Sequence, residues 1–191
     1  MDAQQKARHL RACFGKFATG VTVVTYRADE EVRGVTMNSF TSVSLDPALV
    51  LLSIARTAKT CDALDGIPFA VNILRVDQMD VALHFAGRPR PGALIKWAEA
   101  EDTRLPYLED ALAVFQCRHW NRYDGGDHVL HIGEIVASTM NEGEPLLFNS
   151  GRFTSPGLSI IDGPLVTSFD GPPVPAWVGA LHRVHRIMDH S

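Results

Sequence analysis

The chain has 191 residues, of which 46% are hydrophobic and 21% are charged, a balance typical of one globular domain and unlike that of disordered chains. Its 18 lysines and arginines against 22 aspartates and glutamates give a formal net charge of −4, which disfavours nucleic acids and anionic membranes as partners. Apolar runs such as Ala48–Ile54 are far shorter than the roughly 20 residues of a membrane-spanning helix, so no membrane span is predicted.

The N-terminus and the cysteines indicate a reducing compartment. The first residues contain no sustained apolar run of a secretion signal, and Cys13, Cys61 and Cys117 lack the spacing of a disulfide framework. We therefore expect a cytoplasmic protein. The chain also lacks the residue spacings of Rossmann folds, phosphate loops, nucleophile elbows and zinc proteases.

The N-terminal part predicts one helix followed by strands. Apolar residues at helical spacing in Ala3–Phe17 form one stripe, which is typical of an amphipathic helix. β-Branched residues then predict a strand at Val21–Tyr26 and three successive strands within Val32–Ile54. The clearest break among these strands is Asp46-Pro47, because a residue before proline avoids the helical conformation.

The rest of the chain predicts more strands than helices. A hairpin is expected around the turn residues Asp124-Gly125-Gly126-Asp127. The proline-containing segment Arg88–Asp110 has weak periodicity and predicts an irregular loop that serves as a lid or a dimer-facing arm. The other expected elements are helices at Ala58–Leu64 and Asp77–Phe85 and strands at Phe69–Leu74, Ala111–Asn121, Val129–Ser138, Pro145–Phe148 and Gly151–Phe153.

Most of these strands are joined by short turns, which favours a mainly β (α+β) fold with flanking helices. Such connections indicate an antiparallel barrel rather than a parallel sheet. We expect the folded domain to span residues 1–153. Residues 154–191 would then form a proline-rich extension that ends in a helix at Ala176–Met188 and needs another surface to lie on.

A row of polar side chains marks a candidate binding site. In the strand segment Val35–Leu45 the even positions carry mostly hydroxyl and amide groups, a pattern that also fits the solvent-facing side of an ordinary strand. Ser53 ends the next apolar strand, and Lys59 and Thr60 stand at the start of a helix, where anions are favoured. A hydrogen-bonding strand face beside a phosphate site predicts a slot for flavin mononucleotide.

Two groups of histidines are candidate metal ligands by residue type, but we predict no metal site. His128 and His131 are three residues apart in a predicted strand, so their rings point to opposite faces and act separately. On the expected C-terminal helix, His182, His185 and Asp189 share one face. That arrangement permits metal ligation but is also typical of a solvated surface.

Several motifs in a fixed order resemble the short-chain flavin reductases, the reductase components of two-component flavin-dependent monooxygenases. The strongest is NSFTSVSLDP, within the segment Gly34–Ile54, and the resemblance covers roughly residues 10–153. The other motifs are FATGVTVVT (Phe17–Thr25), Lys59-Thr60, FAVNIL (Phe69–Leu74), HFAG (His84–Gly87), GDH (Gly126–His128), HIGEI (His131–Ile135), PLLF (Pro145–Phe148) and GRF (Gly151–Phe153).

The resemblance implies an FMN-binding split β-barrel of Greek-key-like topology, which forms a homodimer with flavin in a groove near the subunit interface. The implied cofactor-binding residues are Thr36, Asn38 and Ser39 at the isoalloxazine edge, Ser53 and Ala55 along the ring and ribityl chain, Lys59 and Thr60 at the phosphate, and also Met37, Ile54 and Phe153. Phe153 stands where the family often has tyrosine. His128 is implied to lie near the reduced nicotinamide, although a strand-end histidine in contact with water has the same sequence pattern.

The implied reaction is hydride transfer from NADH or NADPH to FMN or FAD, followed by release of reduced flavin to a partner monooxygenase. The cofactors supply the chemistry, so we expect no indispensable acid or base among the side chains. The sequence leaves the choice of flavin and of nicotinamide open. Candidates for a nicotinamide 2′-phosphate, or simply for solvated surface charges, are Arg56, Arg88, Arg90 and Arg122.

Two other functions fit the same fold. One is a flavin-carrying or flavin-sensing module without catalysis, in which the C-terminal extension shields the ring from nicotinamide. The other is an oxidase related to the pyridoxamine-oxidase branch of split barrels, which would hold FMN tightly and oxidise a small amine or similar substrate.

Overall fold

The structure is a computed structural model that describes residues 1–100 and 104–158. The chain divides into two compact units, Met1–Pro156 and Gly157–Ser191, and all described helices and strands belong to the first. Each helix among the described residues is too short or too polar to span a membrane. The expected helix at Ala176–Met188 and the group His182, His185 and Asp189 lie outside the described residues.

Strands dominate the described part of the chain. The helices are α1 (Ala3–Phe14), α2 (Lys59–Ala63), the short 3-10 helix η1 (Val76–Gln78) and α3 (Met79–Phe85). The strands are β1 (Thr19–Gly20), β2 (Thr22–Ala28), β3 (Glu31–Met37), β4 (Thr41–Leu45), β5 (Ala48–Ala55), β6 (Phe69–Ile73), β7 (Trp97–Glu99), β8 (Pro106–Leu108), β9 (Ala113–Gly125), β10 (His128–Met140), β11 (Leu147–Asn149) and β12 (Arg152–Thr154).

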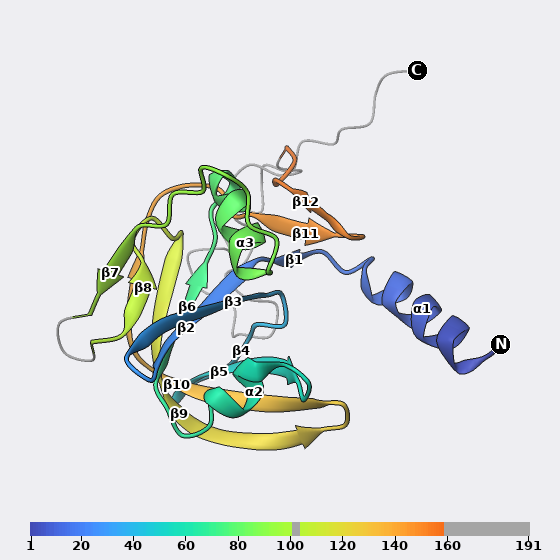
Figure 1. Cartoon of the computed structure of the whole chain (residues 1–191), viewed down its shortest axis with the longest axis horizontal. Helices are drawn as coiled ribbons and strands as arrows, with labels where there is room; N and C mark the ends of the chain where they lie inside the picture. Colours follow the sequence, from blue (N-terminus) through green and yellow to red (C-terminus); the bar gives the residue numbers. More distant parts are fainter. Residues whose placement is uncertain (101–103, 159–191) are drawn as a thin grey trace, which may run out of the picture. The chain divides into compact units, whose positions relative to one another are not determined.

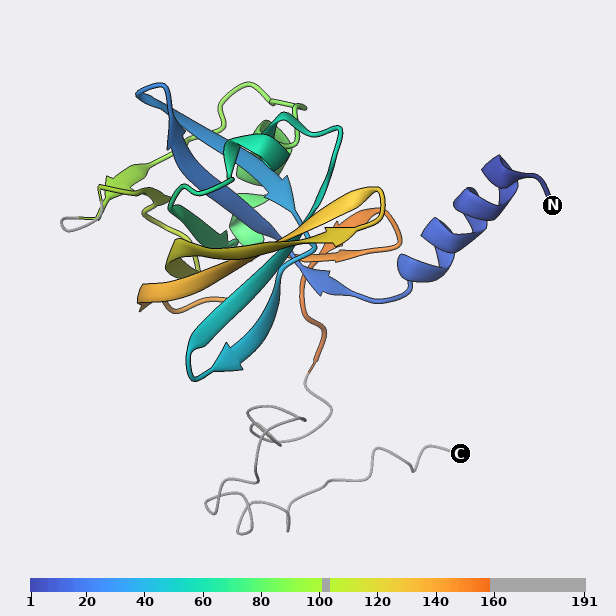
Figure 2. The ribbon, with the colours of Figure 1, turned by 90° about the horizontal axis from the view of Figure 1, so that it is seen from below.

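A seven-stranded sheet with the order β3-β2-β6-β9-β10-β5-β4 forms the main body, and every neighbouring pair in it is antiparallel. Three strands separate β2 from β5 in this order, yet Val24 of β2 and Leu52 of β5 belong to one hydrophobic cluster. The sheet is therefore curled into a barrel (Figures 1 and 2). Because the edge strands β3 and β4 do not pair with each other in the described sheet, the barrel is split.

A second core lies on the outer side of one half of this sheet. Val23 of β2 and Val114 of β9 alternate with residues that face the barrel interior, so they point outwards. Val81 and Ala82 of α3 cover them, together with Leu108 of β8. The outer side of the other half, formed by β10, β5 and β4, carries the candidate site described below.

The strands expected from the sequence are confirmed, with different boundaries. The segment Val32–Ile54 forms β3, β4 and β5, and the predicted hairpin is formed by β9 and β10. Both hairpin strands are longer than expected, so the turn shrinks to Gly126 and Asp127, and His128 becomes the first residue of β10. Gly126 has a φ of 77°, a backbone conformation that glycine adopts without steric cost.

The segment Arg88–Asp110, expected to be wholly irregular, contains the paired strands β7 and β8. The buried Thr25 hydroxyl donates a hydrogen bond to the Pro106 carbonyl (2.6 Å), and the Leu108 backbone N–H donates to the Asn72 side chain (2.7 Å). Buried polar groups of β2 and β6 thus take β8 as their hydrogen-bond partner. The prediction of an irregular loop is wrong for this part of the segment.

Helix α1 has a strong start and an uncovered apolar stripe. The Gln5 backbone N–H donates to the Asp2 carboxylate, and the Asp2 backbone N–H donates to the Gln5 side chain, which completes a capping box. The helix ends at Phe14 rather than at Phe17, and it extends away from the sheet (Figure 2). None of the residues of α1 is buried: Phe14 at its end is 71% exposed, and Phe17 beyond the helix is 79% exposed.

Gly133 of β10 leaves room for the barrel core. A Cβ atom at this position would lie 2.5 Å from the Phe69 ring and 3.0 Å from the Cys117 Cβ. We expect Gly133→Ala to lower the free energy of unfolding by about 1–3 kcal/mol, because the packed core must shift. Gly20→Ala is the matched control, since a Cβ there meets nothing within 4 Å. Equal urea midpoints for the two variants would contradict this packing.

Candidate functional site

The Ser39 side chain joins the β3–β4 connection to β5. Its hydroxyl donates a hydrogen bond to the Ser53 carbonyl (2.8 Å) and accepts one from the Ser53 backbone N–H (3.2 Å). The pairing of β4 with β5 ends at Leu51, so this hydroxyl takes the place of a neighbouring strand at Ser53. Two residues predicted to bind the same ligand are thereby brought into direct contact.

The register between β5 and β10 places His128 beside the end of β5, near Ser53. Ala55 lies opposite His128, and Ser53 lies opposite Leu130. Residues directly opposite each other in a sheet share a face, so Ser53, Ala55 and His128 lie on the outer side of the barrel, where all three are half-buried. The intervening Ile54 is buried in the barrel core, so only its backbone can meet a ligand on this outer face.

His128 is oriented by the residue before it. Its Nδ1 lies 2.7 Å from the Asp127 carboxylate, and a carboxylate only accepts hydrogen bonds, so Nδ1 carries the hydrogen. This contact with His128 holds the pKa of Asp127 below its usual value. In the neutral ring Nε2 is then an acceptor. His131, by contrast, is fully buried and lies opposite Leu52 of the barrel core, which confirms that the two histidines occupy different faces. Burial lowers the pKa of its imidazole.

The two residues predicted to bind phosphate differ in accessibility. Lys59, the first residue of α2, is exposed, and its ammonium group has no hydrogen-bond or ion-pair partner among residues 1–100 and 104–158. The Thr60 side chain is buried and lies within hydrogen-bond distance of the Tyr26 hydroxyl (3.4 Å). The exposed Lys59 ammonium is therefore accessible to a phosphate, whereas the Thr60 hydroxyl is turned towards the core.

The residues predicted at the isoalloxazine edge also differ in how accessible their side chains are to a ligand. The Thr36 hydroxyl donates to the Ala82 carbonyl of α3 (2.7 Å), and Met37 packs against the barrel core. Asn38, in contrast, is exposed and donates to the Thr19 hydroxyl (3.2 Å). Thr36 therefore has a partner within the protein, while the side chains of Asn38 and Ser39 stay near the outer face.

Asn38 borders an apolar cavity of about 340 Å³. Its other lining residues are Arg11, Phe14, Gly15, Phe17, Thr19 and Phe148. Phe153, predicted to contact flavin, packs edge-on against Phe148 with ring centroids 5.4 Å apart. Phe153 thus supports a wall of this cavity from the neighbouring strand.

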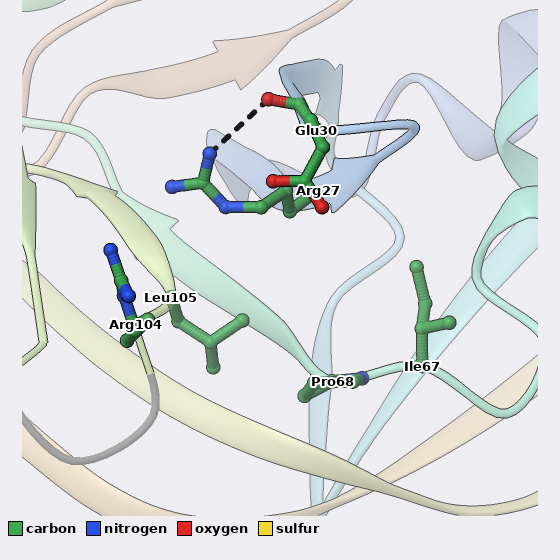
Figure 3. Close-up of a pocket in the computed structure, with 6 residues that line it drawn as sticks. All are labelled: Arg27, Glu30, Ile67, Pro68, Arg104 and Leu105. Atoms are coloured by element: carbon green, nitrogen blue, oxygen red, sulfur yellow. Dashed lines mark hydrogen bonds between the residues drawn. The ribbon is translucent and has the colours of Figure 1, made fainter.

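A cavity of about 370 Å³ elsewhere shares no residue with the predicted site (Figure 3). Arg27 and Arg104 both border it, and both pair with Glu99, at 3.4 Å and 3.1 Å. The Arg27 guanidinium also donates to the Glu30 carbonyl, as Figure 3 shows. These arginines already have acceptors, and we assign no ligand to this cavity.

Three of the arginines considered for a nicotinamide 2′-phosphate are paired with carboxylates. Arg56 contacts Asp124 at 2.9 Å, and Arg122 contacts Asp65 at 2.8 Å. Arg90 lies 3.5 Å from Asp80. An arginine that already neutralises a carboxylate is a weaker phosphate ligand, because the existing pair must be broken first.

The sequence did not single out Asp127 or Phe148. The sequence pattern predicts a turn residue at Asp127, although a carboxylate next to a histidine is itself a signal for a fixed imidazole orientation. For Phe148 the pattern predicts only a place in a strand. Its place in the cavity wall depends on the pairing of β1 with β11, a contact between distant segments that local patterns do not reveal.

The family model of the flavin reductase like domain matches residues 14–157. The chain belongs to this family. The matched range agrees with the segment in which the sequence motifs occur, and it contains every candidate site residue discussed above.

Individual members of the flavin reductase family are similar over most of their length. The FMN reductase (NADH) SmoA of Agrobacterium fabrum is 38% identical over 150 residues, which cover 78% of this chain and 86% of that protein. The reductase component of 4-hydroxyphenylacetate 3-monooxygenase from Thermus thermophilus is 40% identical over 140 residues, which cover 72% and 89%.

A solved structure supports the split-barrel fold. The NADH:FAD oxidoreductase SgcE6 of Streptomyces globisporus, in complex with NAD and FAD fragments, is 37% identical to this chain with a TM-score of 0.72. The match covers 81% of this chain and 94% of that one. The fold predicted from the sequence is therefore confirmed.

The contact between Ser39 and Ser53 gives a test of the site's construction. We expect Ser39→Ala to cost about 1–3 kcal/mol of unfolding free energy, because two half-buried backbone groups of Ser53 lose their partner. We also expect weaker flavin binding in a fluorescence titration. Ser42→Ala is the control, since Ser42 is an exposed residue of β4. If both variants bind flavin and unfold alike, Ser39 does not organise the site.

Proposed function

We propose that the chain is an NAD(P)H:flavin oxidoreductase that reduces FMN or FAD and supplies the reduced flavin to a monooxygenase. The observation that carries this proposal is the cluster along one end of β5. Within the described residues, the Ser53 hydroxyl and the Lys59 ammonium have no hydrogen-bond partner in the protein, and His128 lies beside Ala55 on the same face. Family membership and the names of the similar reductases support the same activity.

The polar groups of the site fit the parts of a flavin. The exposed amide of Asn38 and the hydroxyl of Ser53 offer donors and acceptors for the ring edge and ribityl chain, and the Ser39 hydroxyl holds Ser53 in place beside them. Backbone groups of Met37, Ile54 and Ala55 complete this edge. Lys59, whose charge is not neutralised by any described carboxylate, binds the phosphate as a point charge.

The bound cofactors supply the redox chemistry, which is hydride transfer from the reduced nicotinamide to the flavin. The side chains bind and orient both molecules. His128, with Nδ1 held by Asp127, presents a fixed ring edge to the nicotinamide on the outer face of the sheet. Hydrogen-bond donors around the flavin favour the negative charge of its reduced form.

An assay with purified protein tests this function. Addition of NADH or NADPH with free FMN or FAD should give flavin-dependent loss of the reduced-nicotinamide absorbance. No loss above the protein-free background would contradict the reductase and favour a flavin-carrying module. Yellow colour that survives dialysis, together with oxidation of an amine, would favour the oxidase.

The variant Lys59→Met tests whether Lys59 binds the flavin phosphate. We expect the KM for FMN to rise by about tenfold or more, because a charge-assisted contact to the phosphate is lost. The KM for riboflavin, which has no phosphate, should stay unchanged and serves as the internal control. An equal rise for FMN and riboflavin would show that Lys59 does not bind the phosphate.

We also propose that the protein acts as a homodimer, with the second copy covering exposed apolar surface. Large apolar side chains are exposed on β4 and at the end of β10, with Leu45 94% exposed and Met140 85% exposed, and the stripe of α1 is uncovered. Sedimentation should give about twice the chain mass, and Leu45→Glu should shift it to the monomer. A monomeric wild-type protein at micromolar concentration would contradict this assembly.

The remaining assignments concern the cell and the chain's C-terminal part. We propose a cytoplasmic location, supported by Cys13, Cys61 and Cys117, which are free thiols in the described structure. We propose that residues 1–153 form the catalytic domain. The extension 154–191 would then restrict which nicotinamide or flavin enters the site.

A further inference from the structure

Arg56 makes three contacts with the turn of the β9–β10 hairpin. Its backbone N–H donates to the Asp127 carbonyl (3.0 Å), and its Nε donates to the Gly126 carbonyl (2.8 Å). Its Nη2 lies 2.9 Å from the Asp124 carboxylate, which also accepts the Gly126 backbone N–H (2.9 Å). Arg56, the residue after the end of β5, therefore holds the turn through its side chain at Asp124 and Gly126 and through its backbone at Asp127.

Apart from the pairing of β9 with β10, which extends to Gly125 opposite His128, the turn has few contacts. Residues 121–127 are all exposed, and Gly125 and Gly126 have no side chains that could pack against the barrel. Glycine also increases the conformational freedom of the backbone. Since His128 directly follows this turn, any movement of the turn moves the imidazole and the Asp127 carboxylate that orients it.

We propose that Arg56 is a positioning residue, which fastens the turn 124–127 to the end of β5 and thereby keeps His128 beside Ala55. This inference rests on the proposed role of His128 at the nicotinamide. Arginine suits the task because its planar group directs two N–H donors in fixed directions, to a carbonyl and to a carboxylate, whereas lysine offers one flexible point charge.

The same contacts argue against the other role considered for Arg56. Binding of a 2′-phosphate would need the guanidinium to leave the Gly126 carbonyl and the Asp124 carboxylate, which the structure places at 2.8 Å and 2.9 Å. The hydrogen bond from the Gly126 N–H and, after it, the contact with Arg56 keep the pKa of Asp124 below its usual value. Asp124 is therefore ionised at neutral pH and retains the arginine.

The test uses steady-state kinetics of Arg56→Lys in the full-length protein at saturating flavin. We expect kcat/KM for NADH to fall by about tenfold, mostly through KM, because coupled neighbouring residues commonly contribute effects of this size. The fall for NADPH should be the same. Arg33→Lys is the matched control, since Arg33 and Glu31 form an arginine–carboxylate pair of similar exposure on β3 (52% and 69%, against 46% and 79% for Arg56 and Asp124).

A double-mutant cycle separates positioning from a general structural role. If Arg56 acts through His128, Arg56→Lys should cause no further loss of kcat/KM in a His128→Ala background. Additive losses, or a variant that behaves like Arg33→Lys, would overturn the inference. A loss confined to NADPH would assign Arg56 to the 2′-phosphate instead.

Hydrogen exchange keeps this test independent of the proposed activity. Amides of residues 125–130 should exchange faster in Arg56→Lys than in the wild type and in Arg33→Lys. If the wild type consumed no NADH, the reductase proposal would fail while the exchange experiment still decided whether Arg56 fastens the turn. Unchanged exchange at residues 125–130 would refute the fastening itself.

Discussion

The antiparallel register between β5 and β10 is the constraint on which the candidate site depends. It sets Ala55 opposite His128 and Ser53 opposite Leu130. A shift of one residue would turn Ser53 and Ala55 into the barrel and bring Ile54 to the outer face. Burial of Ile54, Leu52 and Val129 in one core opposes such a shift, so the hydrophobic interior of the barrel determines which polar groups face a ligand.

The site is completed by contacts from segments outside this strand pair. The Ser39 hydroxyl supports β5 where β4 no longer pairs with it, and Arg56 fastens the turn that precedes β10. Both act on the position of other residues. Residues that only position other residues suit a reaction in which the cofactors carry the electrons and the protein orients them. Burial raises the pKa of the Cys117 thiol to about 12, so this cysteine stays protonated and belongs to the core.

Local sequence was sufficient to predict the strands, from β-branched residues, and the hairpin, from the turn residues Asp124-Gly125-Gly126-Asp127. It was also sufficient to separate His128 from His131. It could not show that the Thr36 hydroxyl is bonded to α3 or that Thr60 turns towards Tyr26, since both contacts join segments more than 30 residues apart. The packing of β8 against β2 and β6 was not predicted for the same reason, since Thr25 and Pro106 are 81 residues apart in the sequence.

A structure of the full-length protein with FMN bound is the most direct test of the account. We predict the phosphate at the Lys59 ammonium, the ribityl chain along Ser53 and Ala55, and the ring near Asn38 and Ser39, on the face that carries His128. FMN in the cavity bordered by Arg27 and Arg104, or an outer face of β5 and β10 filled by the protein's own side chains, would contradict it.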